Sequence, residues 1–173
     1  MGTFEWAGRD WSPSALPATA ASVVARLASD DREVQSASII ELAETAGIDG
    51  DEVLDAIWDA DDDPLLLDFA AGVLAVGSAR PWRSTVGLCI STVRQWGVVR
   101  GRLIEKGIAD PLRQLSSLSA LLDVVEVMIL DGMEKDEDRE SFLRELYRAE
   151  TTVDKSVAPP GWSDGFEGID GLY

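Results

Sequence analysis

The feature that most constrains this fold is the spacing of apolar residues in the central stretch from Pro81 to Gly132. At about 100° per residue, one apolar face covers each of two consecutive segments. In the first segment that face carries Trp82, Val86, Cys89, Ile90, Val93, Trp96, Leu103 and Ile104. In the second segment it carries Leu118, Leu121, Leu122, Val125, Met128 and Ile129. The spacing predicts two long helices that pack as a central antiparallel hairpin.

The turn between these two helices has a specific local sequence, Gly107-Ile-Ala-Asp-Pro111. Glycine suits the position just after a helix, where the backbone becomes left-handed. Asp110 followed by Pro111 predicts an N-cap with proline at the first helical position. The end of one helix and the start of the next are therefore both specified locally.

The basic residues of the first central helix fall mostly outside its apolar face. Arg83, Arg94 and Arg102 lie away from that face, which makes them candidates for contacts with a protein partner or with another copy of the chain. Arg100 projects instead from the middle of the apolar face, and it is a fourth candidate. A helix kink at a nearby glycine, or snorkelling of the side chain, would put its charge in water. The alternative is a buried guanidinium held by an acidic partner.

The chain as a whole is predicted to be all-α, a helical bundle of about six to seven helices. No segment shows the sustained period-two alternation of a half-buried strand, so no sheet is predicted. Two D-x-x-E patterns, beginning at Asp30 and Asp49, resemble capping boxes and mark the starts of two helices in the N-terminal half.

Changes in composition divide the chain into four parts. These are an N-terminal arm (1–13) anchored by Trp6 and Trp11, an acidic helical subdomain (14–79), a part with the helical hairpin and a C-terminal helix (80–150), and a flexible tail (151–173). The tail is rich in glycine and proline, which favours an extended chain. Its large residues Trp162 and Phe166 either dock on the same chain or form a linear motif for a partner.

The charge of the chain is strongly negative and unevenly distributed. The formal net charge is −17, and residues 1–79 carry three basic and sixteen acidic side chains. Residues 80–113 carry seven basic and two acidic side chains, so the positive charge is concentrated near the centre. Such a field repels nucleic acid and anionic membranes and favours basic partners. The longest apolar run, 64–79, is too short to span a bilayer, and the N-terminus shows no signal peptide, so we expect a cytoplasmic protein.

The residue types present argue against catalysis. The sequence has no histidine, the commonest general base and metal ligand, and its single cysteine, Cys89, lies on an apolar helix face.

Three motif matches also lack the residues that their functions need. The G-x-S-x-G match at 161–165 lacks the strand and histidine that a nucleophile elbow needs. The Asp59–Asp63 run has proline where a calcium loop needs glycine. A helix-turn-helix at 39–57 would carry an acidic recognition helix. We therefore predict no enzyme and no catalytic, cofactor-binding or metal-binding residues.

A family resemblance rests on several short stretches between Arg80 and Phe166. They are Arg80-Pro-Trp, Trp96, Arg100-Gly-Arg-Leu-Ile, Gly107-Ile-Ala-Asp-Pro-Leu, Leu121-Leu-Asp-Val-Val-Glu-Val-Met, Leu146-Tyr147 and Pro159-Pro-Gly-Trp. In these stretches the chain resembles tail assembly chaperones of long-tailed actinobacterial phages. The resemblance implies a non-enzymatic protein that associates with the long tape measure protein during tail assembly and is absent from the finished particle.

Two other functions fit the sequence as well. One is an acidic inhibitor or regulator that mimics nucleic acid and occupies a basic site. The other is a permanent structural component of a virion, such as a head–tail connector. Binding by a mimic should weaken steeply as salt rises, whereas apolar binding of a client should persist. Presence in purified particles would favour the structural component.

Overall fold

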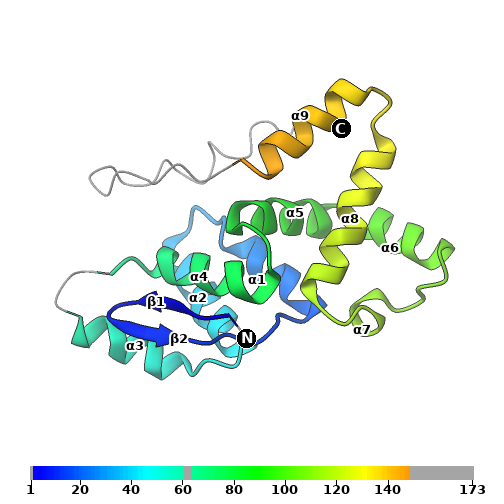
Figure 1. Cartoon of the computed structure of the whole chain (residues 1–173). Coiled ribbons are helices and arrows are strands. Elements are labelled where there is room, and N and C mark those ends of the chain that lie inside the picture. The colour runs from blue at the N-terminus through cyan, green and yellow to red at the C-terminus, as the bar shows by residue number, and fades with distance from the viewer. Residues whose placement is uncertain (1, 61–63, 149–173) are drawn as a thin grey trace.

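A computed structural model describes residues 2–60 and 64–148 of the chain (Figure 1). Its elements are β1 (Phe4–Trp6), β2 (Arg9–Trp11), the 3₁₀ helix η1 (Ala18–Ala20), α1 (Ala21–Arg26), α2 (Arg32–Thr45), α3 (Gly50–Asp59), α4 (Leu66–Ser78), α5 (Trp82–Arg94), α6 (Trp96–Glu105), α7 (Pro111–Gln114), α8 (Leu118–Gly132) and α9 (Asp136–Leu146). The predicted all-α fold is confirmed. The described residues form nine α-helices, more than predicted, because several of the predicted helices are divided.

The prediction that the chain contains no sheet is wrong. Strands β1 and β2 form an antiparallel hairpin with Trp6 opposite Arg9. The two residues between them, Ala7 (φ 50°) and Gly8 (φ 68°), both have positive φ, as a tight type I′ hairpin turn requires. Each strand has only three residues, too few for an alternating pattern to stand out in the sequence.

The hairpin is fixed to α4 by a cluster of aromatic rings. The rings of Trp6 and Trp11 lie 5.0 and 5.3 Å from the ring of Phe69, centroid to centroid. Phe4 packs against Gly72, where an added Cβ would lie 2.3 Å from its ring. Trp6 also donates its indole N–H to the carbonyl of Leu65 at 3.1 Å. The two tryptophans are thus anchors, as predicted, but they anchor a folded hairpin.

The core of the molecule is built around the short helix α1. It lies against α5 on one side and α2 on the other. Val24 of α1 and the neighbouring Leu16 and Leu27 are fully buried. The backbone N–H of Leu118, at the start of α8, donates to the carbonyl of Leu16 at 2.7 Å. This bond joins the last third of the described chain to its N-terminal part, and the buried residues form one continuous cluster.

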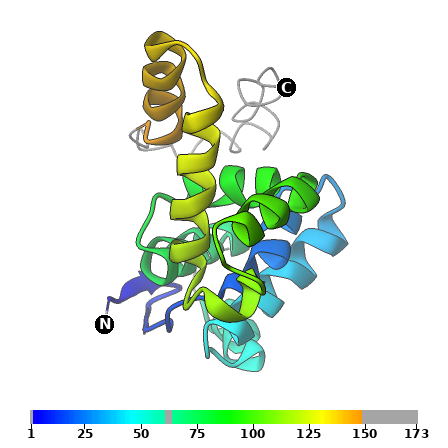
Figure 2. The same cartoon turned by 90° about the vertical axis from the view of Figure 1, so that its right-hand side faces the viewer.

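The two long central helices of the prediction are each interrupted. The first is divided into α5 and α6 at Gln95 (φ −112°, ψ 25°). The second is divided into α7 and α8, and Ser117 caps α8 by accepting a hydrogen bond from the N–H of Ala120 at 3.2 Å. In Figures 1 and 2, α8 crosses α5 and extends beyond it to carry α9.

The break at Gln95 changes which side chains of the first helix face the core. Of α6, only Val99 and Leu103 are buried, whereas Ile104, which was predicted on the apolar face, is exposed. Arg100 is exposed as well. Its charge therefore lies in water, and the alternative of a buried, paired Arg100 is wrong.

The local signals for helix ends were more accurate. Asp49 caps α3 as predicted, and the cap of α2 is Asp31, one residue after the predicted start of the capping box. Gly107 has φ +88° and follows α6, as predicted for a left-handed helix end. Pro111 occupies the first turn of α7, although Asp110 makes no side-chain cap bond.

Candidate functional site

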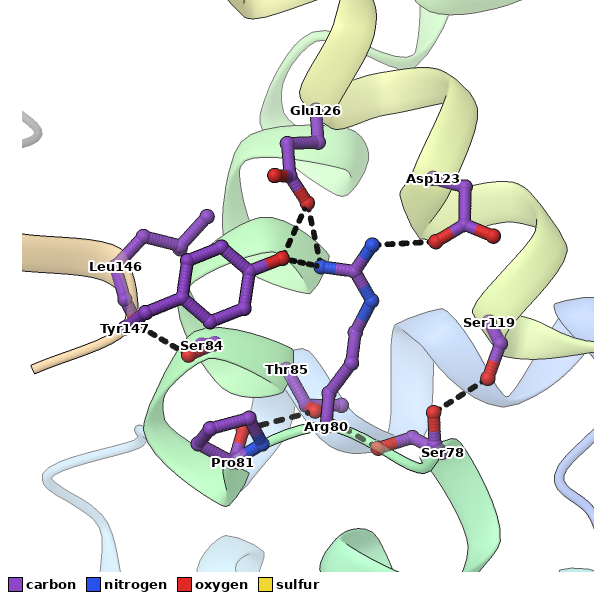
Figure 3. A network of polar contacts seen from close by, with 10 residues as sticks. All are labelled: Ser78, Arg80, Pro81, Ser84, Thr85, Ser119, Asp123, Glu126, Leu146 and Tyr147. Carbon is purple, nitrogen blue, oxygen red and sulfur yellow. Dashed lines mark hydrogen bonds and ion pairs between the residues drawn. The ribbon is translucent and has the colours of Figure 1, made fainter. Parts of the chain in front are cut away.

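The most connected polar side chain among the described residues, Arg80, follows directly after helix α4. Ala79, which ends that helix, has a left-handed backbone (φ 54°, ψ 29°). This conformation costs a non-glycine residue roughly 1 kcal/mol. It turns the chain sharply between α4 and α5, and the side chain of Arg80 crosses to α8 and α9 (Figure 3).

The guanidinium of Arg80 lies between two carboxylates and a phenol. Its Nη1 donates to Oε2 of Glu126 at 2.5 Å and to the hydroxyl of Tyr147 at 2.6 Å, while Nη2 pairs with Asp123. The hydroxyl of Tyr147 donates in turn to Glu126 at 2.7 Å. The side chains of Arg80 and Glu126 are only 11% and 13% exposed, whereas that of Asp123 is 65% exposed. The largely buried part of this network is thus the Arg80–Glu126 pair, and the more exposed Tyr147 completes an Arg80–Glu126–Tyr147 triad.

The surroundings of Arg80 and Tyr147 keep both groups protonated. Burial alone would lower the pKa of Arg80, but its hydrogen bonds to Asp123 and Glu126 raise it overall. The pKa of Tyr147 is raised by burial and by its hydrogen bond to Glu126, against the opposing effect of Arg80. Arg80 therefore stays charged and Tyr147 stays neutral, as a structural network requires. Neither is poised to transfer a proton near pH 7.

Hydroxyl groups around this network join the same helices. Ser84 of α5 donates to the carbonyl of Leu146 in α9, and Ser119 of α8 donates to the carbonyl of Ser78. The buried hydroxyls of Ser78 and Thr85 lie 2.9 Å apart. Every one of these hydroxyls is engaged by a main-chain carbonyl or by another hydroxyl, with no basic side chain to activate it. The arrangement joins the end of α4 to α8 and α5 to α9.

An apolar pocket of about 460 Å³ lies beside the network and is open to solvent. Its lining residues come from α4, from the start of α5 and from the end of α9; they are Ala71, Gly72, Ala75, Pro81, Trp82, Tyr147 and Arg148. Tyr147 belongs to both the pocket and the network, so Arg80 and Glu126 hold one wall of the pocket in place. Phe4 of the hairpin packs on Gly72, another lining residue. Such a pocket can receive an apolar side chain.

The structure separates the predicted partner-binding residues. Arg83 lies next to the pocket, with its guanidinium 5.2 Å from the ring centroid of Trp82. Arg94 ends α5, about 16 Å further along the helix at 1.5 Å per residue. Arg100 and Arg102 are exposed on α6. Trp162 and Phe166 lie outside the described residues, as do the whole tail (151–173) and the G-x-S-x-G match.

The sequence analysis did not identify Arg80, Glu126 or Tyr147 as parts of a site. Arg80 was placed only at the start of the third part of the chain (80–150), and all three residues otherwise appeared only within the stretches that carry the family resemblance. One signal was present, because Asp123 and Glu126 are three residues apart and so share a helix face. That face is acidic and needs a basic partner, but the sequence does not show which of the arginines supplies it.

Other candidate chemistry is absent from the part of the chain that the structure describes. Cys89 is fully buried, and burial raises the pKa of its thiol far above the ordinary value, so it is an inert core residue. No group of three or more potential metal ligands gathers among residues 2–60 and 64–148. Asp59 pairs with Arg9 at 2.6 Å, while Asp61 and Asp63 lie outside the described residues. None of the described helices is long and apolar enough to cross a membrane.

Comparison with known proteins gives one match. Residues 91–168 match a family of unknown function, DUF7240. The match includes Glu126 and Tyr147 of the network and begins after Arg80. No curated protein and no solved structure matches the chain.

Proposed function

We propose that this protein is a non-enzymatic assembly chaperone that binds an apolar helical client. The observation that carries the proposal is the solvent-open apolar pocket between α4, α5 and α9, with one wall fixed by the Arg80–Glu126–Tyr147 triad. No side chain lining this pocket is a nucleophile or a general base. A solvent-open apolar hollow of this kind is suited to holding an apolar side chain.

The size of the pocket suits reversible binding. A single aromatic side chain buries about 150–250 Å², which gives roughly 4–6 kcal/mol at 25 cal/mol per Å² before ordering costs are subtracted. One pocket therefore holds one side chain weakly, with a dissociation constant of about a millimolar or tens of micromolar at best. Weak contacts repeated along a client let a chaperone hold it in solution and release it during assembly.

The charge of the protein supports the same role. With a net charge of −17, the chain stays soluble while it covers apolar segments of a client. Apolar residues supply the affinity, and acidic residues keep the complex in solution. A host-cell cytoplasmic location belongs to this proposal.

The family resemblance indicates which protein the client is. Tail assembly chaperones of long-tailed actinobacterial phages associate with the tape measure protein, which is long and largely helical. The stretches that carry the resemblance include Arg80, Glu126 and Tyr147, which are distant in sequence and meet at the candidate site. We propose that this chain binds and solubilises the tape measure protein of its phage during tail assembly.

A co-expression experiment tests this function. The tape measure protein would be produced with the wild-type chain, with Ala75→Leu, which fills the pocket, or with Ala37→Leu as a matched control. Ala37 is an exposed residue on α2, outside the pocket. We expect pull-down of the client to fall about tenfold with Ala75→Leu, equivalent to 1.4 kcal/mol, and to be unchanged with Ala37→Leu.

Three outcomes would contradict the chaperone proposal. If the client is equally soluble without this chain and never co-purifies with it, the chaperone proposal is wrong. Binding only to basic targets, lost as salt rises, would favour the acidic mimic. Recovery of the protein from purified particles would favour a permanent structural component.

A further inference from the structure

Helix α3 presents an acidic face with an exposed tryptophan near the C-terminal end of the helix. Trp58 is 86% exposed, and Leu54, one turn before it, is 43% exposed. At about 100° per residue, Asp51 and Asp55 lie beside Trp58 on the same face. The opposite face of α3 is buried through Val53 and Ala56. A tryptophan this exposed is unusual for a residue that stabilises only its own chain, and tryptophan is enriched among interface hot spots.

Helix α6 presents an exposed side that contains two glycines, Gly97 and Gly101, which we call the glycine floor. Gly97, Gly101 and Ile104 follow one another along the exposed side of the helix, at spacings of four and three residues. A Cβ added at either glycine would meet nothing within 4 Å, so the backbone of α6 is open to an approaching side chain. Arg100 lies beside this line on one side; on the other side Glu105 lies beside it and Arg102 follows further round the helix, and all three are exposed.

The two arginines are available for a partner. Arg100 and Arg102 form no ion pair with any residue of 2–60 or 64–148. Together with Lys106 they outnumber the one acid of this helix, Glu105, so the exposed side of α6 has a net positive charge that is complementary to the acidic face of α3. The two faces also match in shape, because one has a large projecting side chain and the other has a glycine floor.

The two faces lie at opposite ends of the molecule, α3 at the lower left and α6 at the right of Figure 1. A contact between them must therefore form between two copies of the chain. It uses a different surface on each copy. A bound pair therefore still has a free α3 face at one end and a free α6 face at the other end. Such a heterologous contact builds a ring or an open chain of copies.

We propose that this protein self-associates head to tail, with the Trp58 face of α3 seated on the Gly97–Gly101 face of α6 of the next copy. In this contact Trp58 covers the glycine floor, and Asp51 and Asp55 face Arg100 and Arg102. The contact does not depend on a client, so it can be tested independently of the proposed chaperone function.

Sedimentation velocity of the full-length protein tests the contact. We expect the mass of the wild-type chain to grow with concentration at low salt and less at high salt, since screening weakens the ion pairs. Trp58→Ser removes the projecting side chain, and Gly101→Leu blocks the floor while improving helix propensity. Each variant alone should associate at least about 30-fold more weakly than the wild type, as expected for a hot-spot residue.

Mixing the two variants gives the decisive result. Trp58→Ser keeps a working α6 face, and Gly101→Leu keeps a working α3 face, so the mixture should form a one-to-one dimer that grows no further. A second pair gives an independent check if either variant misfolds. The chains Asp51→Lys/Asp55→Lys and Arg100→Glu/Arg102→Glu should each be monomeric alone and should form long alternating chains when mixed.

The proposal would be overturned by any of three results. The first is a wild-type chain that stays monomeric at about millimolar concentration and low salt, where weak contacts are populated. The second is a Trp58→Ser variant that associates as well as the wild type. The third is a mixture that stays monomeric while the wild type associates, which would place the contact on other surfaces.

Discussion

The N-terminal hairpin and helix α9 flank the same pocket, but they are attached to the molecule by different forces. The hairpin is attached to α4 by stacked aromatic rings that centre on Phe69. Helix α9 buries Phe142 and Leu146, and it is also tied to α5 and α8 through Ser84 and the Arg80 network. Aromatic packing changes little with pH or salt, whereas a network of charges responds to both. The attachment of the hairpin should therefore depend little on pH and salt, whereas the attachment of α9 should depend on both.

The largest expected effect comes from breaking the aromatic side. Phe69→Ala should lower the free energy of unfolding by about 3–5 kcal/mol, because it removes a fully buried ring and leaves a cavity. Urea unfolding followed by circular dichroism measures the change. Phe69→Leu, which keeps most of the apolar volume, should cost clearly less. Equal costs for the two variants would show that the ring contacts contribute nothing beyond their bulk.

A smaller loss is expected from breaking the polar side. Arg80→Met should cost about 3 kcal/mol, since it leaves the carboxylate of Glu126 largely buried without its cation. The double variant Arg80→Met/Glu126→Gln should be more stable than Arg80→Met alone. Asp123→Asn is the matched control, and it should cost less than about 1 kcal/mol because Asp123 is mostly exposed. Urea unfolding gives the stabilities, and amide hydrogen exchange should show α9 opening first in Arg80→Met.

If Arg80→Met and Asp123→Asn have the same small effect, the triad does not hold α9. The apolar contacts of Phe142 and Leu146 would then suffice to hold this helix.

The smallest expected effect is a pH dependence from Tyr147. Its pKa is raised in the folded protein, so the folded state holds the phenol proton more tightly than the unfolded chain does. The resulting stabilisation is fully present below about pH 10, the ordinary pKa of tyrosine. It is lost as pH rises through the raised, folded-state pKa. Unfolding measured between pH 9 and 11 should therefore show a steeper loss of stability in the wild type than in Tyr147→Phe.

Buried Cys89 and the remaining tyrosine titrate in both chains, so only the difference between them reports Tyr147. A difference of the opposite sign would mean that the phenolate is favoured in the folded state.

Local features of this fold were predictable from sequence because they depend on neighbouring residues. Asp49 caps α3 through an N–H two residues away, and Gly107 ends α6 through its own backbone conformation. The helical character of the central segment followed from the apolar spacing alone. The apolar spacing did not locate the break at Gln95, which lies two residues before Gly97, although a kink at a nearby glycine was one of the two alternatives that would put the charge of Arg100 in water.

The candidate site was not predictable because its parts are far apart in sequence. Arg80 meets Asp123, Glu126 and Tyr147 at separations of 43, 46 and 67 residues. No local pattern indicates which arginine crosses to α8, and the sequence analysis chose the more exposed Arg83, Arg94, Arg100 and Arg102 instead. The hairpin was missed for a different reason, since its strands are too short to show alternation.

The placement of Tyr147 and Arg148 in the pocket wall has a consequence for timing. A chain is made from its N-terminus at about 5–20 residues per second, and its early parts begin to fold first. The wall that Tyr147 and Arg148 supply is synthesised last among the described residues, roughly 7–30 seconds after residue 1 at those rates. Until then the growing chain has α4 and α5 but only an incomplete pocket. The pocket is therefore complete only after nearly all of the described chain has been synthesised.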